Sequence, residues 1–212
     1  MNAAASRNTA APVKPAAPMN PAAPVNSAAP RGTARLPWRD IATSAGVALV
    51  LRILAVFWGA GRVPPSADGA FYHVVAGRIA EGHGYSWLWP DGVVTPAAHY
   101  PIGYPALLGA GYALFGAHPV VAMTLNALIG ALGVGAAHAL GFFTVNESSW
   151  SASARRAAFV LALALAFSPT LVAYTPALMT ESAVGTLLVA AVLAVFVTSR
   201  SSSSNRPLRV GT

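Results

Sequence analysis

Cysteine is absent from this 212-residue chain, which excludes disulfides and thiolate metal sites. Charge is scarce as well, at 9% of residues, whereas soluble domains carry about 25%. Hydrophobic residues make up 55% of the chain, so it has too little polar surface to face water on every side. The composition therefore predicts an integral membrane protein.

The first 37 residues are rich in Ala and Pro and show no apolar periodicity. Proline removes the backbone donor that a helix needs, so this segment is expected to be a disordered tail. The first apolar run begins only after Arg39 and is not followed by a convincing cleavage site, which argues against a signal peptide.

Four apolar runs in the remaining chain are expected to cross the bilayer, which makes the predicted fold all-α and integral to the membrane. The expected spans are residues 41–60, 120–142, 157–173 and 181–197. Ser168 and Pro169 lie within the third run, where a proline can kink or end a helix.

The basic residues indicate how the chain crosses the membrane. Ten of the thirteen Lys and Arg residues lie before the first span, between the second and third, or after the fourth. Because positive charge favours the cytoplasmic side, we expect both termini in the cytoplasm of a multi-pass inner (plasma) membrane protein. The loop 61–119 would then lie outside, and the Ser- and Arg-rich residues 199–212 inside.

The outer loop contains a short expected helix over residues 69–80, with Asp68 at its N-cap position. Its apolar side is predicted to lie on the membrane interface. The residues expected on that side are Phe71, Val74, Val75 and Ile79. Trp87 and Trp89 follow and are typical of headgroup depth.

Two acidic residues are the candidate catalytic groups. With this topology Asp68 and Glu181 fall on the same outer side, each at the mouth of an apolar helix. Partial desolvation at such a boundary favours use of a carboxylate as a general base. The alternative is that Asp68 only caps its helix and Glu181 only complements a helix dipole.

The histidines offer a weaker signal. His73, His83 and His99 share the outer loop with these acids, but no HxxxH or HExxH spacing occurs, so a divalent metal is left open as a cofactor. His99 and Tyr100 belong to a proline-rich turn and could donate hydrogen bonds to a phosphate or sugar. Nucleic acid is not an expected partner, because the basic tail is sparse and lacks interleaved aromatic residues.

The order of several motifs resembles the N-terminal part of bacterial GT-C glycosyltransferases. Dolichyl-phosphate-mannose protein mannosyltransferases and aminoarabinose lipid A transferases are the relatives nearest in pattern. The motifs are Asp68-x-x-x-Tyr72-His73-x-x-Ala76, Glu81-Gly82-x-Gly84-Tyr85, His99-Tyr100-Pro101-x-x-Tyr104-Pro105 and Met179-Thr180-Glu181. The resemblance covers residues 38–197.

This resemblance implies transfer of a sugar from a polyprenyl-phosphate donor to a lipid, glycan or protein on the non-cytoplasmic face. Asp68 would be the base that activates the acceptor, and Glu181 would shape the same site. The candidates for binding the donor phosphate or sugar are His73, Arg78, His99 and Tyr100. Family members have more spans and a further outer domain, so the chain is expected to be an N-terminal fragment that needs its C-terminal part or a partner subunit.

A second interpretation is a non-catalytic membrane subunit or transporter fragment. Small residues in the second span permit close helix packing. Arg52 lies in the middle of the first span, where a charge costs about 2.5–3.5 kcal/mol on insertion scales, so it is expected to face other helices or a wet cavity. In this interpretation Arg52 would pair with an acidic residue of a partner.

Overall fold

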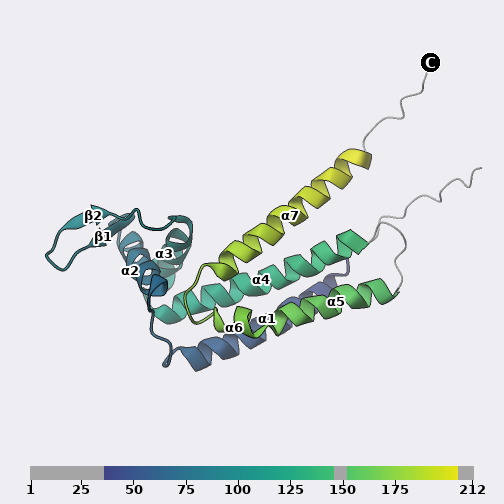
Figure 1. The fold of residues 1–212 in the computed structure, drawn as a ribbon, viewed down its shortest axis with the longest axis horizontal. Coiled ribbons are helices and arrows are strands. Elements are labelled where there is room, and N and C mark those ends of the chain that lie inside the picture. The colour runs from purple at the N-terminus through teal and green to yellow at the C-terminus, as the bar shows by residue number, and fades with distance from the viewer. Residues whose placement is uncertain (1–35, 146–151, 205–212) are drawn as a thin grey trace, which may run out of the picture. The chain divides into compact units, whose positions relative to one another are not determined.

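The structure is a computed structural model that describes residues 36–145 and 152–204. Residues 1–35 of the expected disordered tail and residues 146–151 of the expected inner turn lie outside the described residues. The described part is mostly helical (Figure 1). It contains three helices long and apolar enough to cross a membrane: α1 (Trp38–Gly59), α4 (Pro119–Val145) and α7 (Glu181–Ser204).

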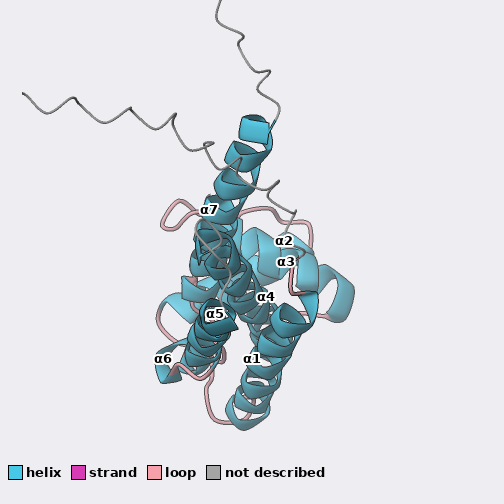
Figure 2. Ribbon diagram, turned by 90° about the vertical axis from the view of Figure 1, so that its right-hand side faces the viewer, coloured by secondary structure: helices cyan, strands magenta, loops and turns pink. Residues whose placement is uncertain are grey.

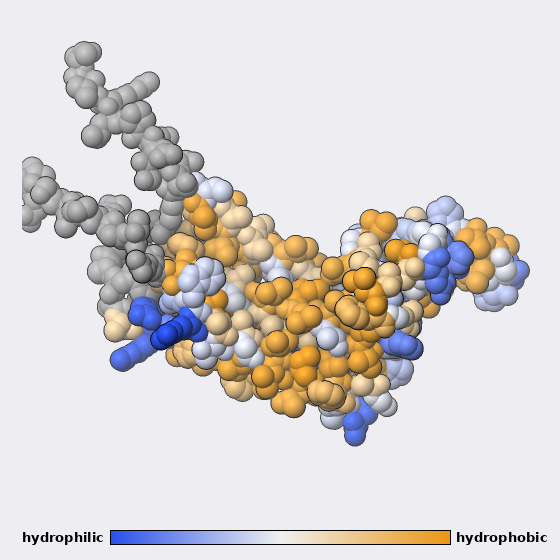
Figure 3. Space-filling view, turned by 180° about the vertical axis from the view of Figure 1, so that it is seen from behind, coloured by the Kyte–Doolittle hydropathy of each residue, from blue (hydrophilic) through white to orange (hydrophobic). Residues whose placement is uncertain are grey.

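These three helices correspond to the first, second and fourth predicted spans. At a rise of about 1.5 Å per residue, the 22 residues of α1 extend about 33 Å, enough for the hydrocarbon core. One face of the molecule is apolar over the middle of the helices, with hydrophilic residues at both ends (Figure 3). The chain therefore has the character of a multi-pass membrane protein. Helix α7 continues to Ser204, past the expected end of the span at 197, and residues 205–212 of the expected tail lie outside the described residues.

The third apolar run does not form one continuous helix. It is divided into α5 (Ala152–Ala166) and α6 (Pro169–Ala173). Ser168 has ψ 116°, outside the helical region, because the ring of Pro169 disfavours a helical residue before it. The 15 residues of α5 extend only about 22 Å, so a fourth membrane span is not established.

Helix α4 is the central element, since it contacts α1, α5, α7 and the outer helix α3 (Gly103–Phe115). Glycines on α4 allow the neighbouring helices to approach it closely. The Cα of Gly133 faces Thr186 of α7, whose hydroxyl donates to the carbonyl of Ile129 at 3.0 Å. In the first turn of α1, Asp40 forms an ion pair of 2.7 Å with Arg155 of α5.

The segment between α1 and α4, named the outer region here after the expected outer loop 61–119, contains a β-hairpin that we did not predict. It joins α2 (Asp68–Ala80) to α3 through the antiparallel strands β1 (Ser86–Leu88) and β2 (Val94–Pro96). Gly92 adopts φ +86° in the connecting turn, a conformation that glycine permits. Figure 2 shows the outer helices α2 and α3 side by side.

The buried side of α2 differs from the predicted apolar side. Tyr72, Val75 and Ala76 are buried, whereas Val74 is 42% exposed. The reason is that α2 packs against α3, where Gly109 admits the side chain of Ile79. Helix–helix packing, rather than contact with the membrane surface alone, therefore selects this side.

The side-chain amide of Asn126 bonds to two elements that are separate in the sequence. Asn126 of α4 accepts a hydrogen bond from the hydroxyl of Tyr104 in α3 at 3.0 Å and donates from its amide nitrogen to the carbonyl of Thr175 at 3.3 Å. Asn126 is fully buried, so these bonds satisfy a polar group that would be costly alone.

We predict that Gly109→Ala destabilises the α2–α3 contact. A Cβ at this position would lie 2.8 Å from Cγ2 of Ile79 and 3.1 Å from the carbonyl oxygen of Ala76. Overpacking of this kind costs about 1–3 kcal/mol, which lowers the melting temperature in detergent by several degrees. Gly103→Ala, in the same helix but with nothing within 4 Å of the added Cβ, is the control and should leave it nearly unchanged. Equal melting temperatures for the two variants would contradict this packing.

Candidate functional site

Asp68 is the first residue of α2 rather than its N-cap. The cap is Ala67, and no side chain caps the helix. The Oδ1 of Asp68 instead accepts a hydrogen bond of 2.6 Å from the hydroxyl of Tyr100, 32 residues further along the chain. The capping prediction is therefore wrong, because the carboxylate points to the turn before α3 and not to its own backbone.

Tyr100 is held in place by several outer residues. Its carbonyl accepts a hydrogen bond from the hydroxyl of Tyr85. Its ring centroid lies 5.2 Å from those of Phe71 and Tyr72 and 4.4 Å from that of His99. The hydrogen bond to Asp68 raises the pKa of Tyr100 to about 12, with smaller contributions from burial and from the charge of Asp68. Tyr100 is therefore a neutral donor to the carboxylate at physiological pH.

Glu181 begins α7 close to the same outer elements. The connection before it passes directly over the start of α2, since a Cβ at Gly69 would lie 2.8 Å from the carbonyl oxygen of Ala177 and 3.4 Å from the Cβ of Leu178. The side chain of Glu181 is exposed, although the residues after it, Ser182 and Ala183, are buried. The two predicted catalytic acids thus begin two helices whose N-terminal segments lie together.

Tyr72 links the two acids and was missing from our candidate residues. It is 5% exposed, and burial raises its pKa, with further contributions from the negative charges of Asp68 and Glu181. Both carboxylates therefore act electrostatically on one phenol. Tyr72 could have been identified from the sequence, because it follows Asp68 by four residues and residues i and i+4 share a face of a helix.

The backbone is strained beside both acids. Among the described residues, only two non-glycine residues have positive φ: Ala67 at +47°, directly before Asp68, and Leu178 at +54°, three residues before Glu181. Such conformations cost about 1–3 kcal/mol each and are concentrated at functional sites. Leu178 is fully buried, so packing of its side chain holds the unfavourable backbone in place.

A large groove opens beside Asp68. It has a volume of about 810 Å³ and runs between α3, α4 and α7. Its polar end is formed by Asp68, Tyr72, Tyr100, Tyr104 and Thr180. The remainder is mainly apolar, with Leu107, Ile129, Leu132, Val184 and Leu187 among its residues. The groove therefore joins a carboxylate and several hydroxyls to an apolar channel along two membrane-length helices.

The other predicted binding residues are placed differently. His99 is exposed and lies beside Tyr100. The Nδ1 of His73 lies 2.7 Å from the hydroxyl of Tyr112 on α3, and burial lowers the pKa of His73, with a smaller effect from His118. Arg78 donates from Nε to the hydroxyl of Ser86 at 2.9 Å and so ties α2 to β1. Of the four predicted binding residues, the structure brings Tyr100 to Asp68 and places His99 beside Tyr100, whereas His73 and Arg78 bond elsewhere.

Metal binding has no preformed site in the described part of the chain. Within residues 36–145 and 152–204, no three His, Asp or Glu side chains are grouped closely enough to hold an ion. The chemistry that this arrangement offers is that of a carboxylate with phenolic donors around it.

No protein-family model matches the chain, and no match to a curated protein or to a solved structure was found. The resemblance to GT-C glycosyltransferases therefore rests on the sequence motifs alone.

We predict that Asp68→Asn moves the ionisation of Tyr100 from about pH 12 toward the ordinary value of 10, because the charged acceptor is lost. The measurement is the absorbance of tyrosinate during alkaline titration of Asp68→Asn and of Asp68→Asn/Tyr100→Phe. The difference between the two curves gives the ionisation of Tyr100. Because the pKa of Tyr100 is raised on folding, its bond to Asp68 stabilises the fold fully below pH 10, and this contribution is lost as the pH rises toward about 12. A titration of Tyr100 that does not respond to Asp68→Asn would exclude the bond.

Proposed function

We propose that this protein is a membrane glycosyltransferase, or the N-terminal region of one, that transfers a sugar from a polyprenyl-phosphate donor to an acceptor on the non-cytoplasmic side. The observation that carries the proposal is the position of Asp68 at the polar end of an apolar groove of about 810 Å³. The order of sequence motifs supports the same class of reaction.

The groove suits a donor with a long apolar chain. Leu107 of α3, Leu132 of α4 and Leu187 of α7 line it, and all three are more than 40% exposed. Covering apolar surface of this kind is favourable by about 25 cal/mol per Å² in water. In a bilayer the groove would instead select its lipid donor by shape and by the polar groups at one end. The donor phosphate would then lie near the hydroxyls around Asp68.

Asp68 is the proposed general base. The acceptor hydroxyl would attack the anomeric carbon of the sugar while its proton passes to the carboxylate of Asp68. The bond between the anomeric carbon and the phosphate oxygen would break, and the phosphate would leave with the electron pair. Tyr100 would orient the carboxylate through its 2.6 Å hydrogen bond, and Glu181 would add negative charge beside Tyr72. His99, exposed beside Tyr100, is a donor available to the leaving phosphate.

We further propose four spans with both termini in the cytoplasm. Helices α5 and α6 together extend over residues 152–173, and the connection after them lies beside the outer end of α4, where Thr175 bonds to Asn126. Pro176 lies against Gly59 at the end of α1, which supports a return of the chain to the outer side before α7 begins.

For catalysis, we predict that Asp68→Asn lowers sugar transfer by about 10²–10⁴-fold, because an amide cannot accept the acceptor's proton. The assay measures transfer from polyprenyl-phosphate sugars in membranes from cells that express the complete reading frame. Asp91→Asn is the matched control, since Asp91 lies in the exposed hairpin turn and bonds only to the backbone nitrogen of Val93 among the described contacts. Unchanged transfer by Asp68→Asn would remove Asp68 from the reaction.

For topology, the natural lack of cysteine allows single thiols to report sidedness. We predict that Asp91→Cys and Ala173→Cys react with an impermeant thiol reagent in intact cells, whereas Ala152→Cys reacts only after permeabilisation. All three positions are exposed. Reaction of Ala173→Cys and Ala152→Cys from the same side would exclude a crossing by α5 and α6.

A further inference from the structure

Arg52 is a buried cation in a membrane-length helix. Its side chain is 2% exposed, and Nη1 donates to the carbonyl of Ala48 at 3.2 Å, within the same helix. Its Nε has no hydrogen-bond partner within residues 36–145 and 152–204. A charged group in this position is stabilised only by a counter-charge, by further hydrogen bonds or by water. The contacts within α1 supply just one of these bonds.

The neighbouring helix is shaped to accept this side chain. A Cβ at Gly130 of α4 would lie 2.5 Å from Nε of Arg52 and 3.1 Å from its Cδ. The guanidinium therefore lies against bare backbone and is directed between α1 and α4, away from the apolar exterior. The prediction that Arg52 faces other helices or a cavity agrees with this placement.

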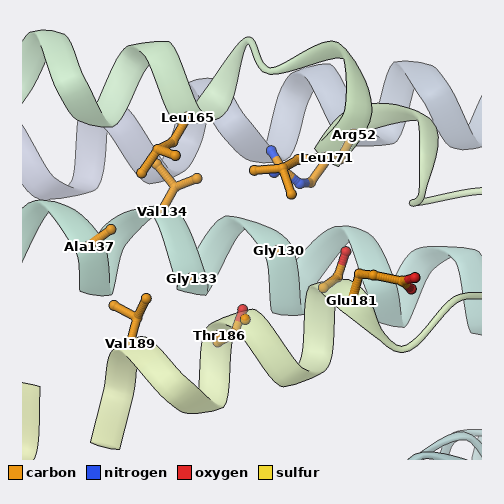
Figure 4. Close-up of a pocket in the computed structure, with 12 residues that line it drawn as sticks. Arg52, Gly130, Gly133, Val134, Ala137, Leu165, Leu171, Glu181, Thr186 and Val189 are labelled. Atoms are coloured by element: carbon orange, nitrogen blue, oxygen red, sulfur yellow. The ribbon is translucent and has the colours of Figure 1, made fainter. Parts of the chain in front are cut away.

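Arg52 lines a cavity of about 140 Å³ between α1, α4 and α7 (Figure 4). Its lining combines glycines and small polar residues of α4 and α7, such as Gly133 and Ser182, with apolar side chains such as Val134, Leu171 and Val189. A buried water needs about 10–15 Å³ of such volume and two to four polar partners. The cavity therefore has space for several waters, and Arg52 and Ser182 supply polar groups.

Glu181 is the only acidic residue among those that line this cavity. Glu181 is the first residue of α7, and Figure 4 shows its carboxylate directed away from Arg52. On that side its charge acts on Tyr72 and Tyr104, both of which line the groove beside Asp68. Glu181 thus lies between the cavity that contains Arg52 and the proposed catalytic groove.

We propose that Arg52 and Glu181 form a water-bridged charge pair across this cavity, in which Arg52 is a positioning residue for the carboxylate of Glu181. In this proposal the counter-charge of Arg52 belongs to this chain rather than to a partner protein. The proposal concerns the charges of two residues and not the reaction catalysed, so it can fail while sugar transfer is upheld, and the reverse.

The first test is a double-mutant cycle on the full chain in detergent, followed by thermal unfolding. Arg52→Met and Glu181→Gln should each lower the melting temperature, Arg52→Met by about 5 °C or more, and the double variant should recover at least half of the summed loss. Arg62→Met with Glu81→Gln is the matched control, because both side chains are exposed and have different partners, the carbonyl of Trp58 for Arg62 and His83 for Glu81. Their effects should be small and additive. Additive effects of Arg52→Met and Glu181→Gln would overturn the pair.

A second test does not require Arg52→Met to fold. Ser182→Cys places a single thiol in the cavity, and its rates with an anionic and a cationic methanethiosulfonate are compared in membranes. Both hydrophilic reagents should react if the cavity is hydrated, as the proposed pair requires. Adding Glu181→Gln should raise the ratio of anionic to cationic rates several-fold, since the charge of Arg52 would then be uncompensated. An unreactive thiol, or a ratio unchanged by Glu181→Gln, would overturn the proposal.

Discussion

The close approach of two backbone segments determines how the outer part of this protein is built. Gly69, in the first turn of α2, lies under the carbonyl of Ala177, and an added Cβ would be only 2.8 Å from that oxygen. Leu178 reaches this position with a positive φ and a fully buried side chain. The segments that begin α2 and α7 are therefore held together, and with them the acidic residues that open each helix. Without this contact, Asp68 and Glu181 would have no reason to act on the same tyrosine.

The outer helices and the membrane-length helices make different contributions to the proposed site. The outer region supplies the polar groups: the carboxylate of Asp68, the hydroxyl of Tyr100 and the exposed ring of His99. Helices α4 and α7 supply the long apolar walls of the groove. An amphipathic substrate, with one charged end and a lipid tail, fits this division better than a small soluble substrate does. A polyprenyl-phosphate sugar has this form.

Much of the helical architecture could be predicted because apolar runs of about 20 residues carry a strong signal. The ends of α1 and α4 lie within three residues of the expected bounds. The break before Pro169 was also readable, since proline acts locally. The hairpin at 86–96 was missed because its strands have three residues each, too few for an alternating pattern to be distinguished.

Prediction of the site was less complete, because its contacts join distant parts of the chain. Asp68 had the position of a capping residue, and only the fold brings Tyr100 to its carboxylate. The buried side of α2 was likewise decided by α3, through the space at Gly109. His73 belongs to the same motif as Asp68 and Arg78 to the same helix, yet they bond to Tyr112 and Ser86. Motif order alone does not distinguish the sides of a helix.

The two bonds of Asn126 have a mechanical consequence. Its carbonyl oxygen holds Tyr104 of α3, and its amide nitrogen holds the backbone of Thr175 in the connection to α7. Since one planar group makes both bonds, a rotation that kept one would tend to break the other. Widening of the groove, as the entry of a lipid tail would require, should therefore proceed by a concerted tilt of α3 with the α6–α7 connection, and not by independent movement of either one.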